Sequence, residues 1–378
     1  MKKIIGFVFN FDYKNWMGGT NYMINLLKAI NLNNKNYKII ILTGLPKKNL
    51  PIELKKYNIV KLEILKKKKI NIIINYLRIL TLILFKKDLI LENILKKHNI
   101  DVLSHSFFLG SKSRIKSIFW IPDLQEIYLK KNFSLRARFR RFFYNYLSTY
   151  HSTNILFSSH AMKKLFLKNY KCNESKIKVL KFIPSIPKKI SKPKKIKIKK
   201  KYFFISNQFW KHKNYDLVVD ALIHLKKKNI KPYIYSTGHK KDWRFENYYE
   251  KLIKKIKIND IKNFKILGTL NRNEQIYLMK NAMAIINPSQ SEGWNTAIEE
   301  AKLLKNKILA SRIEVHKEQL GKNGVYFSPT NHIELSNILE KEYFKKKNRT
   351  IKYKKLKKLN LKKILEFGNN YTNIIEKL

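Results

Sequence analysis

The sequence predicts an α/β protein built from two parallel-sheet domains in tandem. At 378 residues the chain is too long for one ordinary core and about right for two domains of typical size. Short apolar runs alternate with helix-like stretches, and the series starts twice along the chain. Such alternation is typical of a parallel sheet covered by helices.

The first series lies in the N-terminal half. Its strand-like runs are 4–9, 37–42, 118–120 and 154–157, and a helix is expected over 22–30. The run 4–9 follows Met1-Lys2-Lys3 but ends at Asn10, with no small-residue cleavage site after it, so it indicates a first buried strand rather than a signal peptide.

A segment rich in proline and lysine, 183–200, separates the two series and is the best candidate for a linker. After it come expected strands at 202–206, 232–236, 264–267 and 284–287, with an amphipathic helix over 215–226. We therefore expect Rossmann-like domains at 1–185 and 186–358. The helical spacing of Leu, Ile and Phe over 359–378 predicts a crossover helix that packs back across the junction.

The formal net charge is +55, with 81 Lys and Arg against 26 Asp and Glu. Such a charge suggests nucleic acid, an anionic membrane surface or phosphorylated ligands as partners. The lysines are spread along the whole chain, together with abundant Ile, Asn, Tyr and Phe, as an AT-rich coding sequence would produce. We therefore favour solvated lysine faces, with attraction to acidic lipids or anionic ligands as the alternative.

Cys172 is the only cysteine, so an internal disulfide is impossible and a reducing, cytoplasmic location is expected. The apolar run 70–85 is too short, and too interrupted by Asn71, Asn75 and Arg78, to span a bilayer. A buried or surface helix is expected there. Because Lys66 to Lys69 and Lys86-Lys87 flank it, a helix on the cytoplasmic face of a membrane is the alternative.

The candidate site lies at 284–301. An apolar strand ends at Pro288, a polar loop follows, and a helix begins near Asn295 or Thr296, both acceptable N-caps. Ligands of open α/β sheets bind at the carboxyl ends of the strands, and a helix N-terminus there suits a diphosphate. Glu292 in the loop and Glu300 in the helix, with seven residues between them, could meet a sugar and ribose hydroxyls. Taken alone, they could equally be solvated acids.

Ordered motifs extend this pattern over most of the chain. The segment P-S-Q-S-E-G-W-N-T-A-I-E-E-A (288–301) resembles the E-x7-E signature of family-four (group 1) retaining glycosyltransferases of the GT-B fold. The family's phosphate-binding loop resembles the segment I-S-N-Q-F-W-K-H-K-N (205–214). A stretch on the acceptor side of the family resembles F-W-I-P-D-L-Q (119–125). S-S-H-A (158–161) and G-G-T (18–20) match a helix start and the glycine-rich turn after the first strand.

The resemblance implies two Rossmann-like domains facing each other across a cleft, and it implies roles for individual residues. Lys213 would pair with the donor diphosphate. Asn207 and Gln208 stand where the family pattern carries an Arg, so amides would assist this lysine. On the donor side, the resemblance further implies Gly293, which follows the first acid, and the backbone N–H groups of Trp294, Asn295 and Thr296. Gly18 and Gly19 would let the backbone approach the phosphates or the acceptor.

For the chemistry, the resemblance implies that Glu292 orients the transferred sugar while the departing phosphate assists the acceptor, so catalysis depends on positioning. Asp123 is the candidate acceptor contact, although Pro122 stands where many relatives carry a His. His105 and His160 are alternatives, but each is more simply explained by packing. No D-x-D motif or His/Cys cluster occurs, so neither a metal nor another cofactor is expected.

The expected function is retaining transfer of a sugar from a nucleotide-diphosphate sugar to a glycan or lipid-linked acceptor, in bacterial surface polysaccharide synthesis. Two alternatives stay open. One is a nucleotide-sugar epimerase or hydrolase on the same scaffold. The other is a noncatalytic basic protein that binds nucleic acid or anionic lipid, although no nucleic-acid motif accompanies the basic stretches, so no nucleic-acid partner is expected.

Overall fold

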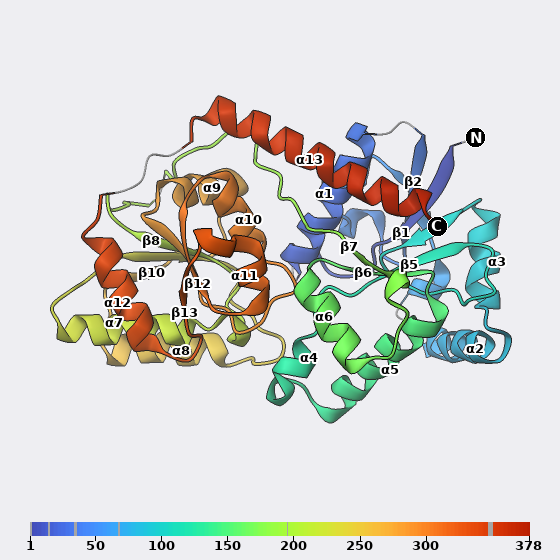
Figure 1. Ribbon diagram of the computed structural model, residues 1–378, viewed down its shortest axis with the longest axis horizontal. Helices are drawn as coiled ribbons and strands as arrows, with labels where there is room; N and C mark the ends of the chain where they lie inside the picture. Colours follow the sequence, from blue (N-terminus) through green and yellow to red (C-terminus); the bar gives the residue numbers. More distant parts are fainter. Residues whose placement is uncertain (1, 14–15, 34–35, 67–68, 195, 347–350) are drawn as a thin grey trace. The chain divides into compact units, whose positions relative to one another are not determined.

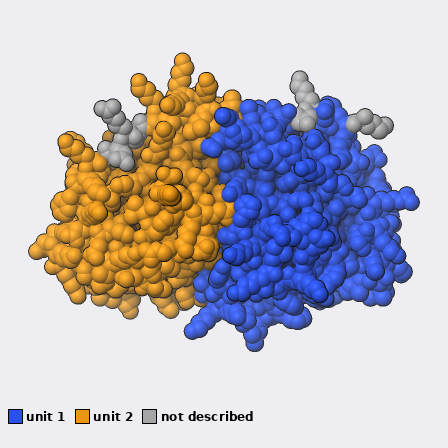
Figure 2. Space-filling model, in the orientation of Figure 1, with its two compact units in different colours: residues 1–183, 362–378 blue, residues 184–361 orange. Residues whose placement is uncertain are grey.

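The computed structural model describes residues 2–13, 16–33, 36–66, 69–194, 196–346 and 351–378 (Figure 1). The chain forms two compact units, coloured separately in Figure 2. Unit 1 comprises residues 1–183 and 362–378, and unit 2 comprises residues 184–361.

Unit 1 is a parallel sheet of seven strands in the order β3-β2-β1-β4-β5-β6-β7. Its strands are β1 (Lys3–Val8), β2 (Tyr37–Thr43), β3 (Asn58–Lys61), β4 (Val102–Ser104), β5 (Lys116–Trp120), β6 (Asn154–Phe157) and β7 (Ile177–Val179). Its helices are α1 (Met17–Asn33), α2 (Lys69–Phe85), α3 (Leu89–Lys97), α4 (Gln125–Tyr128), α5 (Leu135–His151) and α6 (His160–Asn169).

Unit 2 is a parallel sheet of six strands in the order β10-β9-β8-β11-β12-β13. Its strands are β8 (Phe203–Ser206), β9 (Ile234–Thr237), β10 (Phe264–Ile266), β11 (Ala284–Asn287), β12 (Lys307–Ser311) and β13 (Val325–Phe327). Its helices are α7 (Tyr215–Lys227), α8 (Tyr248–Ile258), α9 (Arg272–Asn281), α10 (Thr296–Leu303), α11 (Glu314–Leu320) and α12 (His332–Tyr343).

Both sheets have the doubly wound order, so the expectation of two Rossmann-like α/β domains is confirmed. Helices cover both faces of each sheet (Figure 1), and the strands are therefore buried on both sides. In unit 2 two apolar clusters form the cores of the two faces, one containing Phe203 and Ile205 and the other containing Phe204. The alternation of these three residues between the clusters reflects the period of two in a strand.

The C-terminal helix α13 (Tyr353–Glu376) contributes to both units. Leu356 is buried in the unit 2 core, and Asn360 Nδ2 donates a hydrogen bond of 2.7 Å to Pro184 O. Farther along, Phe367 and Tyr371 are buried in unit 1, where the Tyr371 hydroxyl donates to Ser104 Oγ at 2.8 Å. The helix begins six residues before the predicted 359, since its first turns pack on unit 2.

The proline-rich segment, which was expected to be a linker, packs against unit 2. Chain from 184 to 200 has no helix or strand among its described residues, but it belongs to unit 2. Ile186, Ile190 and Ile198 pack against the unit 2 core, and Pro187 O accepts a hydrogen bond of 2.7 Å from the Tyr353 hydroxyl. The segment thus lies along unit 2 as part of its surface.

The run 70–85 forms helix α2, as predicted. It lies on the surface of unit 1 with many of its apolar side chains exposed, so of the two expected settings, buried or surface, the structure shows the surface one. Of the flanking lysines, Lys67 and Lys68 lie outside the described residues. Across the part of the chain that the structure describes, no helix is long and apolar enough to cross a membrane.

Candidate active site

The candidate site of unit 2 lies at the topological switch point of its sheet. Strands β8 and β11 are neighbours in the centre, and the chain leaves them toward opposite sides, β9 following β8 and β12 following β11. The loop after β8 carries Asn207, Gln208 and Lys213, and the loop after β11 carries Glu292. Ligands of doubly wound sheets bind in the crevice at this point.

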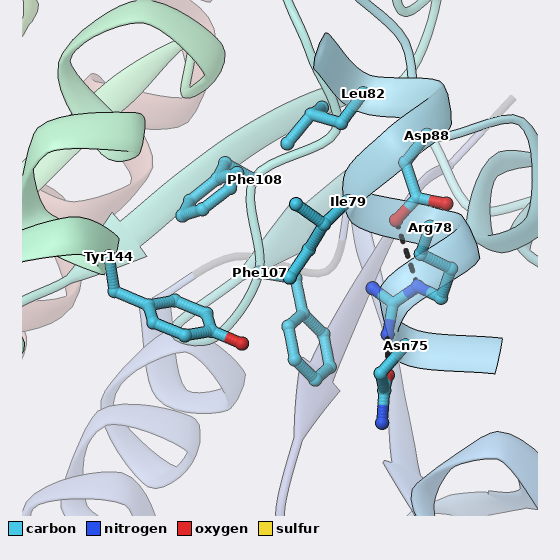
Figure 3. Close-up of a pocket in the computed structure, with 8 residues that line it drawn as sticks. All are labelled: Asn75, Arg78, Ile79, Leu82, Asp88, Phe107, Phe108 and Tyr144. Atoms are coloured by element: carbon cyan, nitrogen blue, oxygen red, sulfur yellow. Dashed lines mark hydrogen bonds and ion pairs between the residues drawn. The ribbon is translucent and has the colours of Figure 1, made fainter. Parts of the chain in front are cut away.

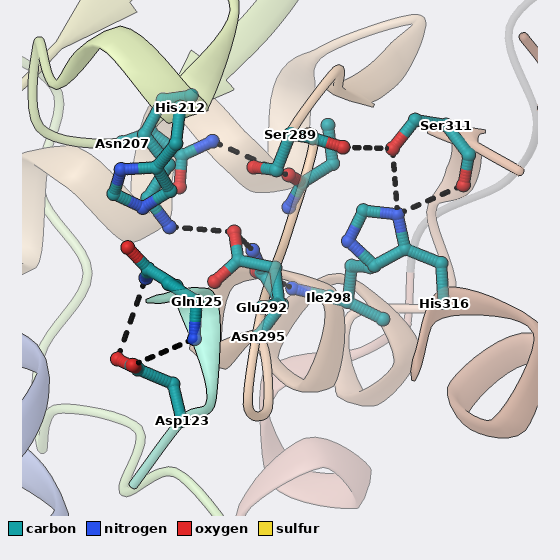
Figure 4. Close-up of polar contacts among 12 residues, drawn as sticks. Asp123, Gln125, Asn207, His212, Ser289, Glu292, Asn295, Ile298, Ser311 and His316 are labelled. Carbon is teal, nitrogen blue, oxygen red and sulfur yellow. Dashed lines mark hydrogen bonds and ion pairs between the residues drawn. The ribbon is translucent and has the colours of Figure 1, made fainter. Parts of the chain in front are cut away.

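Glu292 is held by two donors. Its Oε1 lies 2.5 Å from Lys213 Nζ and accepts a 2.8 Å hydrogen bond from Asn295 Nδ2 (Figure 4). The Glu292 and Lys213 side chains are 7% and 12% exposed. The structure therefore brings the two predicted key residues together as a nearly buried ion pair, a strong interaction at low local dielectric.

The start of α10 is fixed by two side chains. Asn295, the predicted N-cap, accepts a hydrogen bond from Ile298 N at 3.1 Å. Gln319 of α11 accepts from Asn295 N at 3.1 Å and donates to Asn295 O at 3.0 Å. The Asn295 N–H is therefore occupied, and the expectation that it binds a diphosphate does not fit this structure. Gly293 is buried, and Trp294 and Thr296 are partly exposed.

Glu300 lies one turn into α10 and is 1% exposed. Its Oε1 forms an ion pair with Arg272 Nη2 of α9. Arg272 Nη1 donates to Gln275 Oε1 at 3.1 Å, and Gln275 Nε2 donates to Ser206 Oγ at the end of β8. The second acid of the motif is thus tied to the same switch point through two residues that the sequence analysis did not single out.

Asn214 joins three loops of the site. Its backbone is left-handed, with φ of 58°, a conformation that Asn adopts more readily than most residues. From this position Asn214 Nδ2 donates to Pro288 O at 3.1 Å and to Pro329 O at 2.8 Å. The loops that follow β8, β11 and β13 are therefore held in one arrangement.

Three buried polar atoms around the switch point have no hydrogen-bond partner among the described residues. They are Gln208 Nε2, Asn287 Nδ2 and His316 Nε2. Asn287 Oδ1 accepts from Asn207 Nδ2 at 3.4 Å and from Ser289 Oγ at 3.0 Å (Figure 4), so only its amide nitrogen lacks a partner. Buried polar groups are nearly always paired, and three such atoms in one region indicate a place where a polar ligand binds.

His316 of α11 is fully buried beside this region. Its Nδ1 lies 3.0 Å from Ser311 O and 3.1 Å from Ser311 Oγ. Burial lowers the pKa of His316 to about 4, and the neighbouring Lys213 acts in the same direction, while Glu292 opposes it. The ring is therefore neutral near pH 7. When Nδ1–H donates to Ser311 O, Nε2 presents a lone pair.

In unit 1, Asp123 belongs to a charged cluster after β5. Its Oδ1 accepts from Arg141 Nη1 at 3.1 Å and from Gln125 N at 3.3 Å. Arg141 also donates to Glu126 Oε2 at 2.8 Å, and burial raises the pKa of Glu126 although Arg141 opposes it. The Asp123 carboxylate is 22% exposed, so it is held in place and accessible.

The two histidines weighed as alternatives differ in setting. His105 is buried, with Nδ1 2.6 Å from Ser104 Oγ and Nε2 2.8 Å from the Tyr22 hydroxyl. Burial lowers its pKa to about 3, so His105 is a neutral packed residue, as the sequence suggested. His160 is exposed at the first position of α6, whose N-cap is Ser159.

The two glycines of unit 1 do not form a turn. Gly18 and Gly19 lie in the first turn of α1, which begins at Met17. A Cβ on Gly19 would lie 2.6 Å from the Trp16 ring, so Gly19 lets that ring pack over the helix start. Gly18 is exposed, with open space where a Cβ would be. Within the described residues, no group of three or more His, Cys, Asp or Glu could hold a metal ion.

Comparison with known proteins agrees with this geometry. Residues 187–358 match the family model of glycosyl transferases group 1. The sequence similarity to this family is therefore confined to the second half of the chain. The matched residues lie in unit 2 and include Lys213, Glu292 and Glu300. No curated protein matches the chain by sequence.

Solved glycosyltransferase structures share the fold over the full length of this chain. HepE of Anabaena, solved with UDP and glucose, is 14% identical, with complete coverage of both chains and a TM-score of 0.70. Sucrose-phosphate synthase from Thermosynechococcus elongatus is 11% identical, with complete coverage of both and a TM-score of 0.71. The lipopolysaccharide outer core galactosyltransferase WaaB is 15% identical, covering 99% of this chain and 100% of its own, with a TM-score of 0.65. The chain therefore has the GT-B fold, with units 1 and 2 as its two Rossmann-like domains.

Proposed function

We propose that the protein is a retaining glycosyltransferase that moves a sugar from a nucleotide-diphosphate sugar to a glycan or lipid-linked acceptor. One observation carries the proposal: Lys213, Glu292 and Glu300 gather at the switch point of a domain that matches the group 1 family. The three unpartnered polar atoms beside them support a polar ligand.

In the proposed mechanism, the diphosphate binds Lys213 at the switch point, where Gln208 Nε2 can donate a further hydrogen bond. The Lys213 ammonium then stabilises the negative charge that grows on the leaving diphosphate. As the phosphate binds, it replaces Glu292 as partner of the lysine. Glu292 is thereby released to accept from hydroxyls of the transferred sugar, which orients the anomeric carbon toward the acceptor.

Glu300 accepts hydrogen bonds from the ribose hydroxyls in this proposal, with Arg272 fixing its orientation. The bond between the sugar and the diphosphate breaks as the acceptor hydroxyl approaches from the same face. Its proton passes to the departing phosphate oxygen, so the configuration of the anomeric carbon is retained. The residues of this chain position the sugar and stabilise the leaving diphosphate, and no covalent intermediate with the protein is required.

On the acceptor side, Asp123 is the proposed contact, since its carboxylate is fixed by Arg141 and accessible. Asp123→Asn keeps the shape and removes the charge. We expect it to lower transfer to acceptor while donor affinity stays unchanged. Transfer at the wild-type rate would remove Asp123 from the proposal. The lipopolysaccharide outer core galactosyltransferase WaaB, which shares its fold with this chain, motivates a role in surface polysaccharide synthesis.

The test of the proposal is incubation with a panel of radiolabelled UDP-, GDP- and ADP-sugars, with and without glycan and lipid-linked acceptors. Transfer of label to an acceptor, with the donor's anomeric configuration kept in the product, is expected. Free sugar or an epimerised nucleotide sugar, with no transfer to any acceptor, would instead identify an epimerase or hydrolase. Steep, salt-dependent binding of nucleic acid without affinity for any sugar nucleotide would identify a noncatalytic basic protein.

A further inference from the structure

Helix α2 exposes an unusually large apolar face for a surface helix of a soluble protein. Such helices turn apolar side chains toward the core and polar ones toward solvent. In α2 the polar Asn71 and Arg78 are buried. Nine large apolar or aromatic side chains of this 17-residue helix are exposed: Ile70, Ile72, Ile73, Tyr76, Leu77, Leu80, Ile83, Leu84 and Phe85.

The buried polar side chains fasten the helix to unit 1. Arg78 Nε donates to Asp88 Oδ2 at 2.9 Å, and the Arg78 guanidinium lies 4.6 Å from the centre of the Phe107 ring. Figure 3 shows Arg78 and Asp88 on the inner side of α2, beside the pocket that they line with Phe107. Asn71 Nδ2 donates to Glu63 O and Lys66 O at 2.7 Å each. The hydrogen bonds of Arg78 and Asn71 on the buried side of α2 thus hold its apolar side toward solvent.

The charged side chains of the helices α2 and α5 are all basic. Neither α2 nor its neighbour α5 contains an acidic residue. The two helices pack together through Leu82 and Leu147. On α5, Arg136 and Arg140 are exposed beside the exposed aromatic residues Phe139 and Phe142. The whole chain carries a net charge of +55, which disfavours a second copy as the partner of this face.

We propose that the outer face of α2, with the exposed Arg136 and Arg140 of α5, docks the protein on an anionic lipid bilayer. An apolar helix face flanked by basic side chains lies in the plane of the bilayer, with its apolar side chains among the acyl chains and its cations near lipid phosphates. Tyr76 and Phe85, both exposed, suit the boundary between headgroups and acyl chains. The docking surface lies in unit 1 and does not depend on the proposed binding of a nucleotide sugar by unit 2.

The test is co-sedimentation of the full chain with phosphatidylcholine vesicles, with and without phosphatidylglycerol. The test variant is Ile73→Gln/Leu77→Gln/Leu84→Gln, all on the exposed side of α2. The control variant is Ile52→Gln/Ile258→Gln/Leu361→Gln, which removes three exposed apolar side chains elsewhere. Far-UV circular dichroism and thermal unfolding establish that both variants are folded.

We expect the wild type to bind anionic vesicles, to bind neutral vesicles weakly, and to bind less as salt rises. The α2 variant should bind at least about tenfold more weakly, because apolar burial drives insertion, while the control binds as the wild type does. Equal binding by the α2 variant, or no binding by the wild type, would overturn the proposal. So would self-association in vesicle-free solution that the α2 variant abolishes with vesicle binding unchanged.

A second measurement uses the unmodified chain. Amide hydrogen exchange over 69–85 should slow when anionic vesicles are added, because the docked helix is shielded and opens less often. Protection confined to other helices, with 69–85 exchanging as in solution, would place the membrane contact elsewhere and contradict the proposal.

Discussion

Lys213 Nζ lies 2.5 Å from Glu292 Oε1, so the cation proposed to bind a diphosphate is paired with the acid proposed to orient the sugar. This pair makes the two roles interdependent. A diphosphate must compete with Glu292 for the lysine, and Glu292 is released for the sugar only when the phosphate arrives. The pairing therefore predicts opposite effects of substitutions on product binding and on transfer.

Removal of the negative charge at Glu292 should separate binding from catalysis. In Glu292→Gln, the amide keeps the shape but no longer neutralises Lys213 or repels a diphosphate. We expect affinity for the free nucleoside diphosphate to be unchanged or up to about tenfold stronger. Transfer should fall at least about 100-fold, since an interaction with the reacting sugar is lost. Titration calorimetry and initial rates measure the two effects. Full turnover by this variant would contradict the role of Glu292.

Glu300 is expected to recognise the nucleoside rather than the phosphates. Glu300→Gln should weaken binding of a nucleoside diphosphate by about tenfold or more, because charged hydrogen bonds to the ribose are lost. Binding of inorganic pyrophosphate should not change. The matched control is Glu340→Gln, which breaks a different ion pair of unit 2, with Lys228. A parallel loss of pyrophosphate binding in Glu300→Gln would show that the acid acts on the whole site.

Gln319 should contribute to stability through the start of α10. Besides its two hydrogen bonds to the Asn295 backbone, it donates to Glu299 Oε1 at 3.0 Å. Gln319→Leu leaves the Asn295 N–H buried and unpaired, whereas Asn295 O still accepts from Glu299 N and Glu299 Oε1 from Lys302 Nζ. We expect the free energy of unfolding to fall by roughly 1–3 kcal/mol. Urea titration measures this change. A loss below about 0.5 kcal/mol, which is typical of an ordinary surface substitution, would contradict the role of Gln319 in holding the start of α10.

His316 predicts a pH dependence of stability. Because burial lowers its folded pKa to about 4, the unfolded chain binds the proton first as pH falls below about 6.5. Its contribution is fully present above that pH and is lost at roughly 1.4 kcal/mol per pH unit on the way down. His316→Gln should therefore show a shallower decline of unfolding free energy between pH 6.5 and 5.5. An unchanged slope would mean that His316 is protonated in the folded state.

Local signals in the sequence were sufficient for part of this architecture. The strand at 284–287, the cap at Asn295 and the helix over 215–226 depend on residues close together in the chain, and the structure confirms them. No local pattern singles out the strands β3, β4, β7, β12 and β13. Their pairing depends on neighbours in the sheet, which a local pattern does not contain.

The candidate site shows the same division. Glu292, Glu300 and Lys213 were found because they belong to motifs of fixed spacing. Arg272 and Gln319, which hold Glu300 and Asn295, come from α9 and α11, and only the folded chain brings them to the site. The direction of the apolar face of α2 was left open, since the sequence allows a buried helix, a surface helix or a helix on a membrane. The direction depends on Arg78 reaching Asp88.

Binding of a nucleoside diphosphate to the wild type and to a lysine variant tests the central claim most directly. Titration calorimetry with UDP, GDP and ADP first identifies the nucleotide that binds. Lys213→Met should then weaken that binding at least about tenfold, because a partly buried cation is lost from the phosphates. Lys262→Met, at an 84% exposed lysine of the same unit, should bind as the wild type does. Equal affinity in Lys213→Met and the wild type, or an equal loss in both variants, would contradict a donor site at this switch point.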